Sequence, residues 1–377
     1  MNAQELLEYQ WPYLLGCLPP LPLDESARQY GALSRRREVD SASTLLRLAL
    51  AYGFCGLSLR QAAAWAQASG IAVLSDVALL KRLRNAAPWL GYLFFAKLAE
   101  TAALPQLNPL GRRIRLVDAT TISQPGSQGT DYRLHLSYDL VRQAFDHLEL
   151  TDSKGGESLT RFTFAAGDLV VGDRGYSHRP GLYYVVKAGA DFLVRLSWAI
   201  IPLQTLAGEP FDLLRTLRGL PEAQPQAFPL QVAAAPKAGL PAFPVTLVAV
   251  RRSEASADET RRRILIDHTN QRGQLQPRTL EMAGYVCLLT SLNPAQLSAA
   301  DALELYRFRW QAELVFKRLK GLLALGVLPA KDPALVRTII YAKLLAALIL
   351  DDYTGQFLRF FPWGYRVVRT PPLGLED

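Results

Sequence analysis

Hydrophobic residues follow three successive patterns along the chain. Up to about residue 110, alanine- and leucine-rich stretches recur at helical spacing and strand signals are few. From Ile114 the apolar positions alternate or form short runs, which is typical of strands. After Ser298 the helical spacing returns. Helices followed by strands mixed with helices predict an α/β fold with an N-terminal helical domain.

The strands and helices of the central region can be assigned from these patterns. The predicted core strands are Ile114–Asp118, Tyr132–Tyr138, Ala144–Leu150, Leu169–Asp173, Asp191–Leu196 and Tyr285–Thr290, with a helix at Pro180–Ala188. Between Trp198 and Gly284 prolines become frequent, and the predicted strands are Phe228–Val232, Val245–Val250 and Arg263–Ile266. We therefore expect five segments: a helical domain at 1–110, a first core part at 111–197, a β-rich insertion at 198–284, a second core part at 285–330 and a helical region at 331–377.

Two short helices are predicted near the middle of the N-terminal domain. Leu59–Ala68 forms the first, Gly70 breaks it, and Ser75 caps a second helix that runs to about Ala86. The second helix carries the basic residues Lys81, Arg82 and Arg84. A helix-turn-helix with a basic second helix would fit a DNA major groove. A plain helical hairpin with a solvated basic face explains the same pattern.

Composition narrows the class of protein. The net charge is +8, with 33 arginines against nine lysines, and arginine suits phosphate recognition, although GC-rich codons also favour it. Three scattered cysteines and four histidines give no metal-ligand spacing. The apolar run Leu344–Leu350 is too short to span a bilayer, and Met1–Gln10 does not resemble a signal peptide. We expect a cytoplasmic protein without a membrane partner.

Two predicted core strands end in aspartate. Asp118 follows Leu-Val, and Asp173 follows Leu-Val-Val-Gly. A carboxylate at the end of a buried strand is unfavourable unless something neutralises it, and its hard oxygens suit Mg²⁺ or Mn²⁺. A cap or turn residue is the simpler reading of either aspartate alone.

A predicted helix near the C-terminus presents several kinds of polar side chain on one face. Ser298 caps this helix, and Asp301 completes a capping box. The stripe consists of Tyr306, Arg309, Glu313 and Lys320, with Lys317 on the same face. These groups suit phosphate handling. The alternative is an ordinary solvated helix face on which Arg309 and Glu313 form an i, i+4 ion pair. Such a pair typically stabilises a helix by about 0.3–0.5 kcal/mol.

These residues together resemble a known family. The helix fits Y-x2-R-x3-E-x6-K, and the strands read LVDATTI and VVGDRGY. The chain therefore resembles bacterial insertion-sequence transposases of the DDE superfamily, in the branch with the YREK signature. The resemblance covers about Arg113 to Leu323, and the N-terminal helices are similar too.

The resemblance implies an RNase H-like mixed sheet flanked by helices, with an N-terminal helical DNA-binding domain and a β-rich insertion. It implies that Asp118, Asp173 and Glu313 are catalytic and hold two Mg²⁺ ions, with Mn²⁺ as a substitute. The implied DNA contacts are Tyr306, Arg309 and Lys320, to which the sequence adds Lys317, Arg174, Lys81, Arg82 and Arg84. The expected partners are transposon-end repeats, target DNA and a second copy of the chain, in the bacterial cytoplasm at the nucleoid.

Several alternatives remain. A nuclease that cuts without joining, and a transposase-derived protein that only binds DNA, share parts of this pattern. Members of this branch typically cut the second strand through a hairpin intermediate. A relative stacks a tryptophan on a flipped base, but the strand Gly284–Thr290 lacks one; the nearest candidates are Tyr285, Trp198 and Trp310. Arg174 pairing with a core carboxylate is as plausible as a phosphate contact.

Overall fold

The chain forms two units in the computed structural model, called here the helical unit and the sheet unit. The helical unit contains Met1–Ala103, Ile122–Asp131 and Lys317–Asp377, and the sheet unit contains Leu104–Thr121 and Tyr132–Phe316. The structure describes residues 3–35, 37–102, 111–123, 126–127, 129–140, 144–269, 275–307, 309, 328 and 330–354.

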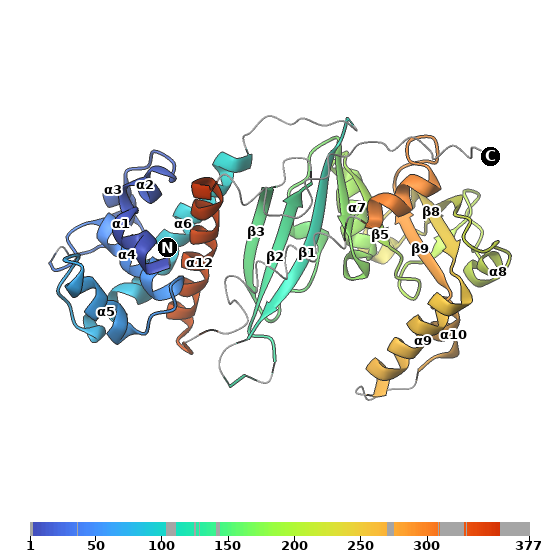
Figure 1. Cartoon of the computed structure of the whole chain (residues 1–377). Coiled ribbons are helices and arrows are strands. Elements are labelled where there is room, and N and C mark those ends of the chain that lie inside the picture. Colours follow the sequence, from blue (N-terminus) through green and yellow to red (C-terminus); the bar gives the residue numbers. More distant parts are fainter. Residues whose placement is uncertain are drawn as a thin grey trace, which may run out of the picture. The chain divides into compact units, whose positions relative to one another are not determined.

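Helices α4, α6 and α12 pack together in the helical unit (Figure 1). Its helices are α1 (Ala3–Tyr9), α2 (Trp11–Gly16), α3 (Leu23–Gln29), α4 (Ala42–Gly53), α5 (Leu59–Ala68), α6 (Asp76–Ala102) and α12 (Pro333–Thr354). The Thr338 hydroxyl of α12 donates to the Leu83 carbonyl of α6 at 2.7 Å. A Cβ at Gly53 would lie 2.8 Å from Ala342 Cβ, so glycine permits the close approach of α4 and α12.

Helix α12 is long and apolar enough to cross a membrane by length and composition alone, over Pro333–Leu350. Buried side chains make up 61% of that window. They include Val336, Ile340 and Leu345, each fully or almost fully buried within the protein. We therefore interpret α12 as the central helix of the helical unit.

The predicted pair of N-terminal helices is present, with one correction. Helix α5 has the predicted bounds, Gly70 adopts φ +64°, and the Ser75 hydroxyl accepts from the Ala78 amide at 3.2 Å. The predicted end near Ala86 was wrong, because α6 continues to Ala102. Its buried stripe extends past the exposed Pro88, so packing maintains a helix that proline usually ends.

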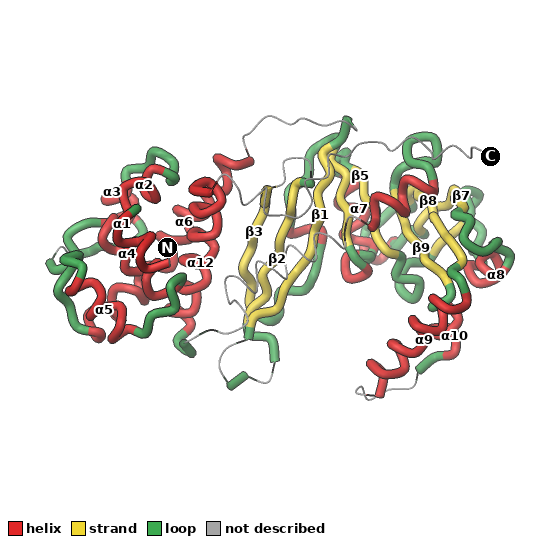
Figure 2. The backbone as a smooth tube through the Cα atoms, in the orientation of Figure 1, coloured by secondary structure: helices red, strands yellow, loops and turns green. Residues whose placement is uncertain are grey.

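A nine-stranded mixed sheet forms the centre of the sheet unit, in the order β3-β2-β1-β4-β5-β9-β8-β7-β6 (Figure 2). The strands are β1 (Arg113–Ile122), β2 (Tyr132–Asp139), β3 (Ala144–Asp152), β4 (Asp168–Gly172), β5 (Asp191–Arg195), β6 (Leu203–Gln204), β7 (Gln226–Val232), β8 (Phe243–Arg251) and β9 (Tyr285–Thr290). Strands β1, β4 and β5 are parallel, and β9 pairs antiparallel with β5. All the predicted core strands are present, but the predicted end of the first at Asp118 was wrong, because β1 continues to Ile122.

One face of this sheet is covered by short helices. The helical elements are η1 (Leu159–Arg161), η2 (Arg174–Tyr176), α7 (Arg179–Lys187), α8 (Leu213–Arg218), η3 (Pro236–Ala238), α9 (Glu254–Thr269) and α10 (Pro277–Met282), and residues 299–307 are also helical. Val117, Val170 and Phe192 of the sheet share a core with Leu182 of α7 and Leu217 of α8. The mixed α/β class is therefore confirmed.

The predicted strand Arg263–Ile266 was wrong, because these residues belong to helix α9. Arg263 pairs with Glu259 one helical turn earlier, and Arg261 pairs with Asp258 at 2.7 Å. Charge pairs at these spacings stabilise a helix, and they outweighed the short apolar run that suggested a strand. The basic residues of this segment are therefore engaged on a helix surface rather than on a strand edge.

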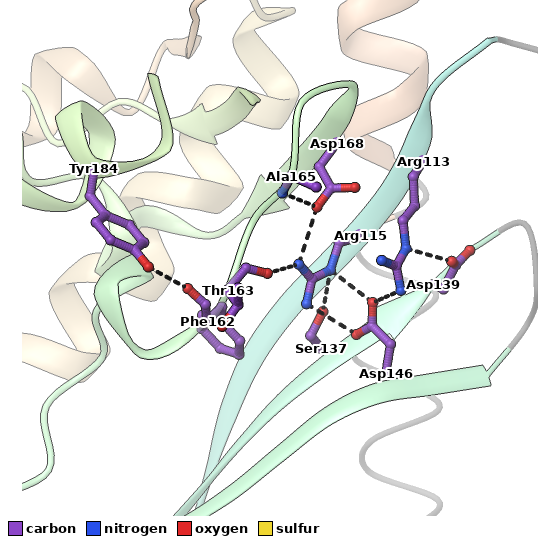
Figure 3. Close-up of polar contacts among 10 residues, drawn as sticks. All are labelled: Arg113, Arg115, Ser137, Asp139, Asp146, Phe162, Thr163, Ala165, Asp168 and Tyr184. Carbon is purple, nitrogen blue, oxygen red and sulfur yellow. Dashed lines mark hydrogen bonds and ion pairs between the residues drawn. The ribbon is translucent and has the colours of Figure 1, made fainter. Parts of the chain in front are cut away.

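Arg115 joins three parts of the sheet unit (Figure 3). From β1, it pairs with Asp146 of β3 at 2.8 Å and with Asp168 at the start of β4 at 3.3 Å, and the three side chains are at most 4% exposed. It also donates to the Ser137 hydroxyl of β2 at 3.2 Å. Its guanidinium lies 5.0 Å from the centre of the Phe164 ring. Arg115 therefore fixes β1 between β2 and β4.

Replacing Arg115 should destabilise the protein strongly. Arg115→Met would leave the buried Asp168 without its cation and Asp146 with Arg113 alone, and breaking a buried pair typically costs about 3–5 kcal/mol. Arg263→Met, which breaks the exposed pair on α9, should cost about 0–1 kcal/mol. Urea unfolding followed by circular dichroism measures both. Equal unfolding midpoints for the two variants would contradict the role of Arg115.

His135 of β2 is fully buried in the same hairpin. Its Nε2 lies 3.0 Å from the Thr151 hydroxyl of β3. Burial, with help from the charges of Arg161 and Arg133, lowers the pKa of His135 to about 4. The ring therefore stays neutral in the folded protein well below the ordinary histidine pKa of about 6.5.

This shift predicts a dependence of stability on pH. Between about pH 6.5 and pH 4 the unfolded chain binds a proton at His135 that the folded protein does not. The free energy of unfolding should therefore fall as the pH is lowered through that window. In His135→Gln the free energy of unfolding should depend less steeply on pH in this window, by up to the equivalent of one bound proton. Urea unfolding at several pH values measures this dependence. Identical slopes for the two proteins would refute the assignment.

Candidate active site

Asp118 and Asp173 lie side by side on two parallel strands. Asp173 directly follows β4, whereas Asp118 lies within β1, which continues to Ile122. In the register of β1 and β4, Leu116 pairs with Val171. Two residues further along each strand come Asp118 and Asp173, about 4.8 Å apart between strand axes and on the same face of the sheet. This is the face opposite Val117 and its core. Parallel pairing thus brings together two aspartates that are 55 positions apart in sequence.

Each aspartate also accepts a backbone hydrogen bond. Asp118 Oδ1 accepts from the Ala119 amide at 2.8 Å, and Asp173 Oδ1 accepts from the Gly175 amide at 2.8 Å. Asp173 is the N-cap of η2. The cap reading of Asp173 is therefore correct, and it orients the carboxylate without excluding a second role. Both residues remain partly exposed to solvent.

Arg195 stands next to Asp173 at the end of the neighbouring strand. Gly172 pairs with Val194, so the next positions, Asp173 and Arg195, fall opposite one another on the same face. Among the residues that the structure describes, no carboxylate forms an ion pair with Arg195. The sequence had predicted this strand but not the role of its last residue. The available signal was that Arg195 is a basic residue at the end of a strand predicted to lie beside the one that Asp173 follows.

Tyr306 and Arg309 of the predicted helix lie in the same neighbourhood. The Arg309 guanidinium lies 5.4 Å from the centre of the Tyr306 ring. Burial raises the pKa of the Tyr306 hydroxyl, the charges of Arg309 and Arg195 oppose this rise, and the charge of Asp173 adds to it. The charges of both Asp173 and Arg195 therefore act on the Tyr306 hydroxyl. The predicted cap is also present, since the Asp301 amide donates to the Ser298 hydroxyl at 3.1 Å.

Arginines and aromatic rings gather beside the aspartates. Arg174, Arg195, Trp198 and Tyr285 line one depression in the sheet unit. Burial and the charge of Arg195 lower the pKa of the Arg174 guanidinium, and Arg252 is affected in the same way. Arg174 makes no ion pair with any carboxylate in the described part of the chain. Positive charge is therefore concentrated where an anion could bind.

A third carboxylate, which sequence reasoning missed, lies close to Asp173. Glu157 precedes η1, and its Oε2 would lie only 2.0 Å from a Cβ placed on Gly175. Burial raises the pKa of Glu157, and the charge of Asp173 adds to this effect. Tyr176 is buried nearby, and its hydroxyl has no hydrogen-bond partner among the described residues. The sequence around Glu157, Gly155-Gly-Glu, looks like an ordinary loop and gives no local sign that Glu157 approaches Asp173.

Part of the predicted site lies outside the described residues. These positions are Glu313, Lys317, Lys320 and the candidate stacking residue Trp310. Their roles stay predictions.

The basic residues of the N-terminal domain belong to α6 in the helical unit. Lys81 is exposed and Arg82 is partly buried. Arg84 pairs with Asp332 before α12 at 2.8 Å, with 46% of its side chain exposed. Seven residues, 69–75, separate α5 from α6, whereas a helix-turn-helix usually has a turn of about three or four. DNA binding by α6 stays a prediction.

The donor set can be tested against a divalent metal ion. Asp118 and Asp173 supply hard oxygen donors at neighbouring positions of adjacent strands, the ligand type that Mg²⁺ prefers. In the described ranges, no three acidic, histidine or cysteine side chains enclose an ion by themselves. A carboxylate from a further segment is therefore needed, and Glu313 is the one that the sequence offers. The two aspartates fit such a centre.

Known proteins resemble this chain over most of its length. A family model for the transposase DDE domain matches residues 109–349. The putative transposase InsL for insertion sequence element IS186A from Escherichia coli (strain K12) is 45% identical over 346 residues, which cover 91% of this chain and 93% of that protein. The transposase for insertion sequence element IS421 from Escherichia coli is 45% identical over 347 residues, with the same coverage.

The family match begins just before β1 and includes both Asp118 and Asp173. A DDE domain implies dependence on a divalent metal ion, typically Mg²⁺, and transposases act on DNA. The nine-stranded mixed sheet flanked by helices is consistent with that fold. The chain therefore belongs to the family of DDE transposases.

Proposed function

We propose that this transposase binds the terminal inverted repeats of an insertion sequence and moves it by cut-and-paste, using Asp118, Asp173 and Glu313 as the acidic triad. The observation that carries the proposal is the register of β1 and β4, which brings Asp118 and Asp173 to neighbouring positions on one face of the sheet. The spacing of Tyr306, Arg309, Glu313 and Lys320 further supports membership in the branch with the YREK signature.

The acidic triad would hold two Mg²⁺ ions, with Mn²⁺ as a substitute. Ions bound there would activate water or a DNA 3′ hydroxyl and stabilise the leaving oxygen. Asp118 and Asp173 contribute by fixing two carboxylates on a rigid sheet, since each is oriented by a backbone amide. Phosphoryl transfer of this kind depends on positioning and charge neutralisation, so it needs no serine or cysteine nucleophile.

The surrounding cations would position the DNA strand. Arg195 beside Asp173 and Arg309 beside Tyr306 would contact phosphate oxygens, and Tyr306 would donate a hydrogen bond from its hydroxyl. Lys320, Lys317 and Arg174 are proposed as further phosphate contacts. The depression beside Arg195 presents Trp198 and Tyr285, which could stack on an extruded base. A hairpin intermediate would require such a base-holding surface.

The strand order supports an RNase H-like core. Strands β3-β2-β1-β4-β5 form a β2–β3 hairpin beside three parallel strands, and β6 to β9 extend the sheet. We propose that residues 1–110 bind DNA, with Lys81, Arg82 and Arg84 facing the phosphates. The segment boundaries predicted from the sequence, from 111–197 to 331–377, stay predictions.

Two copies of the chain should act together, because two transposon ends must meet. We propose a homodimer in the DNA complex, located in the bacterial cytoplasm at the nucleoid. A nuclease without strand transfer and a protein that only binds DNA are the alternatives. The second alternative is disfavoured because acidic groups near phosphate would repel DNA unless metal ions were bound.

The proposed function can be tested with the element's terminal repeats, a target plasmid and Mg²⁺. Excision followed by joining is expected. Asp118→Asn should lower cleavage on the order of 10³-fold by removing a metal ligand, while end binding in a gel-shift assay is retained. Asp258→Asn, an exposed carboxylate on α9, is the matched control and should cut normally.

The outcomes separate the alternatives. Nicking without joining would support the nuclease, and a shifted but uncut band would support the DNA-binding protein. Normal cleavage by Asp118→Asn in Mg²⁺ would overturn the metal assignment.

A further inference from the structure

The loop between β3 and η1 brings a carboxylate close to Asp173. A Cβ placed on Gly175 would lie 2.0 Å from Glu157 Oε2 and 3.1 Å from Asp173 Oδ1. Because both oxygens lie this close to the same Cβ position, Glu157 Oε2 and Asp173 Oδ1 are no more than about 5 Å apart. Gly175 therefore leaves the space between the two carboxylates open, and any larger residue would fill it.

The backbone next to Glu157 is held in place by two arginines of the sheet unit. Arg133 Nη1 donates to the Gly155 carbonyl at 3.0 Å, and Arg161 Nε donates to the Gly156 carbonyl at 2.8 Å. A Cβ on Gly155 would lie 2.1 Å from the Thr151 hydroxyl, so only glycine fits there. These backbone hydrogen bonds fix the position of Glu157 without using its carboxylate.

The Glu157 carboxylate faces Asp173 without a matching partner. No hydrogen bond or ion pair joins it to another described residue. Burial and the charge of Asp173 raise its pKa, and only the charge of Arg133 opposes them. Two carboxylates this close repel one another unless a cation or a proton lies between them.

Tyr176 provides an independent observation. Its side chain is fully buried, and its hydroxyl has no hydrogen-bond partner among the described residues. After burial, the charges of Glu157, Asp118 and Asp173 are the main influences that raise the pKa of this hydroxyl. A buried hydroxyl without a partner costs about 1–3 kcal/mol. A polar ligand among the three carboxylates would satisfy it.

We propose that Glu157 is an outer acidic residue of the metal centre, whose carboxylate accepts a hydrogen bond from a water molecule bound to the ion at Asp173. This inference rests on the proposed function. An outer position fits because no three described acidic residues enclose an ion, while Mg²⁺ in proteins usually keeps several water ligands. Glu157 is thus a positioning residue that orients and retains the hydrated ion.

Binding of Mn²⁺ alone to the full-length protein tests this role without relying on activity. Glu157→Gln keeps the size of the side chain and removes its charge. Its dissociation constant for Mn²⁺, measured from the free-ion signal in electron paramagnetic resonance, should rise about 10–100-fold. The Mn²⁺ concentration needed for half-maximal cleavage should rise in parallel. Glu209→Gln, an exposed carboxylate in the same unit, should bind as the wild type does.

Asp173→Asn separates this inference from the proposed function. If wild-type protein binds no Mn²⁺, or if Asp173→Asn binds it normally, the proposed metal site itself fails. If Asp173→Asn loses binding while Glu157→Gln keeps wild-type affinity, the role of Glu157 is overturned and the proposed function stands.

Gly175→Ala gives a second route that does not alter Glu157 itself. The added methyl group would displace the Glu157 carboxylate, so Mn²⁺ affinity should fall in the otherwise wild-type protein. In a Glu157→Ala background the same substitution should have much less effect, because coupled residues are not additive. An equal loss in both backgrounds would show that Gly175 acts on Asp173 alone and would overturn the proposal. Thermal unfolding checks that each variant is folded.

Discussion

The parallel register of β1 and β4 is the constraint on which the active site depends. One residue of slip would turn one aspartate to the opposite face of the sheet, because side chains alternate along a strand. Arg115 opposes such a slip, since it joins β1 to Asp146 of β3 and Asp168 of β4 three residues before Asp118. Buried ion pairs contribute little net stability on average, and their best-attested use is to specify one arrangement. Here that arrangement aligns the two carboxylates.

The same geometry explains how charge is distributed around the site. The register of three parallel strands brings the side chains of Asp118, Asp173 and Arg195 to neighbouring positions on one face of the sheet. Tyr306 and Arg309 approach from a helix, and Glu157 approaches from the loop beyond β3. Acidic groups are thus surrounded by cations, of which Arg174 and Arg195 form no ion pair with a carboxylate in the described part of the chain. Such an arrangement suits a bound metal ion and a phosphate better than it suits a closed salt-bridge network.

Much of this arrangement was predictable from sequence, and the limits have physical causes. The two aspartates could be found because each directly follows a short apolar run, although β1 continues past Asp118 to Ile122. Arg195 and Glu157 were missed because their roles arise from pairing between distant segments. Charge pairs at helical spacing outweighed strand propensity at Arg263–Ile266, and a continuing buried stripe carried α6 past Pro88. Local patterns predicted the elements, whereas register and loop packing determined which side chains meet.

Anomalous diffraction from crystals containing Mn²⁺ tests the central claim most directly. We predict a peak between the carboxylates of Asp118 and Asp173, beside the end of β4. The peak should disappear in Asp118→Asn crystals grown under the same conditions. A Mn²⁺ peak elsewhere on the protein, with none at the two aspartates, would contradict it.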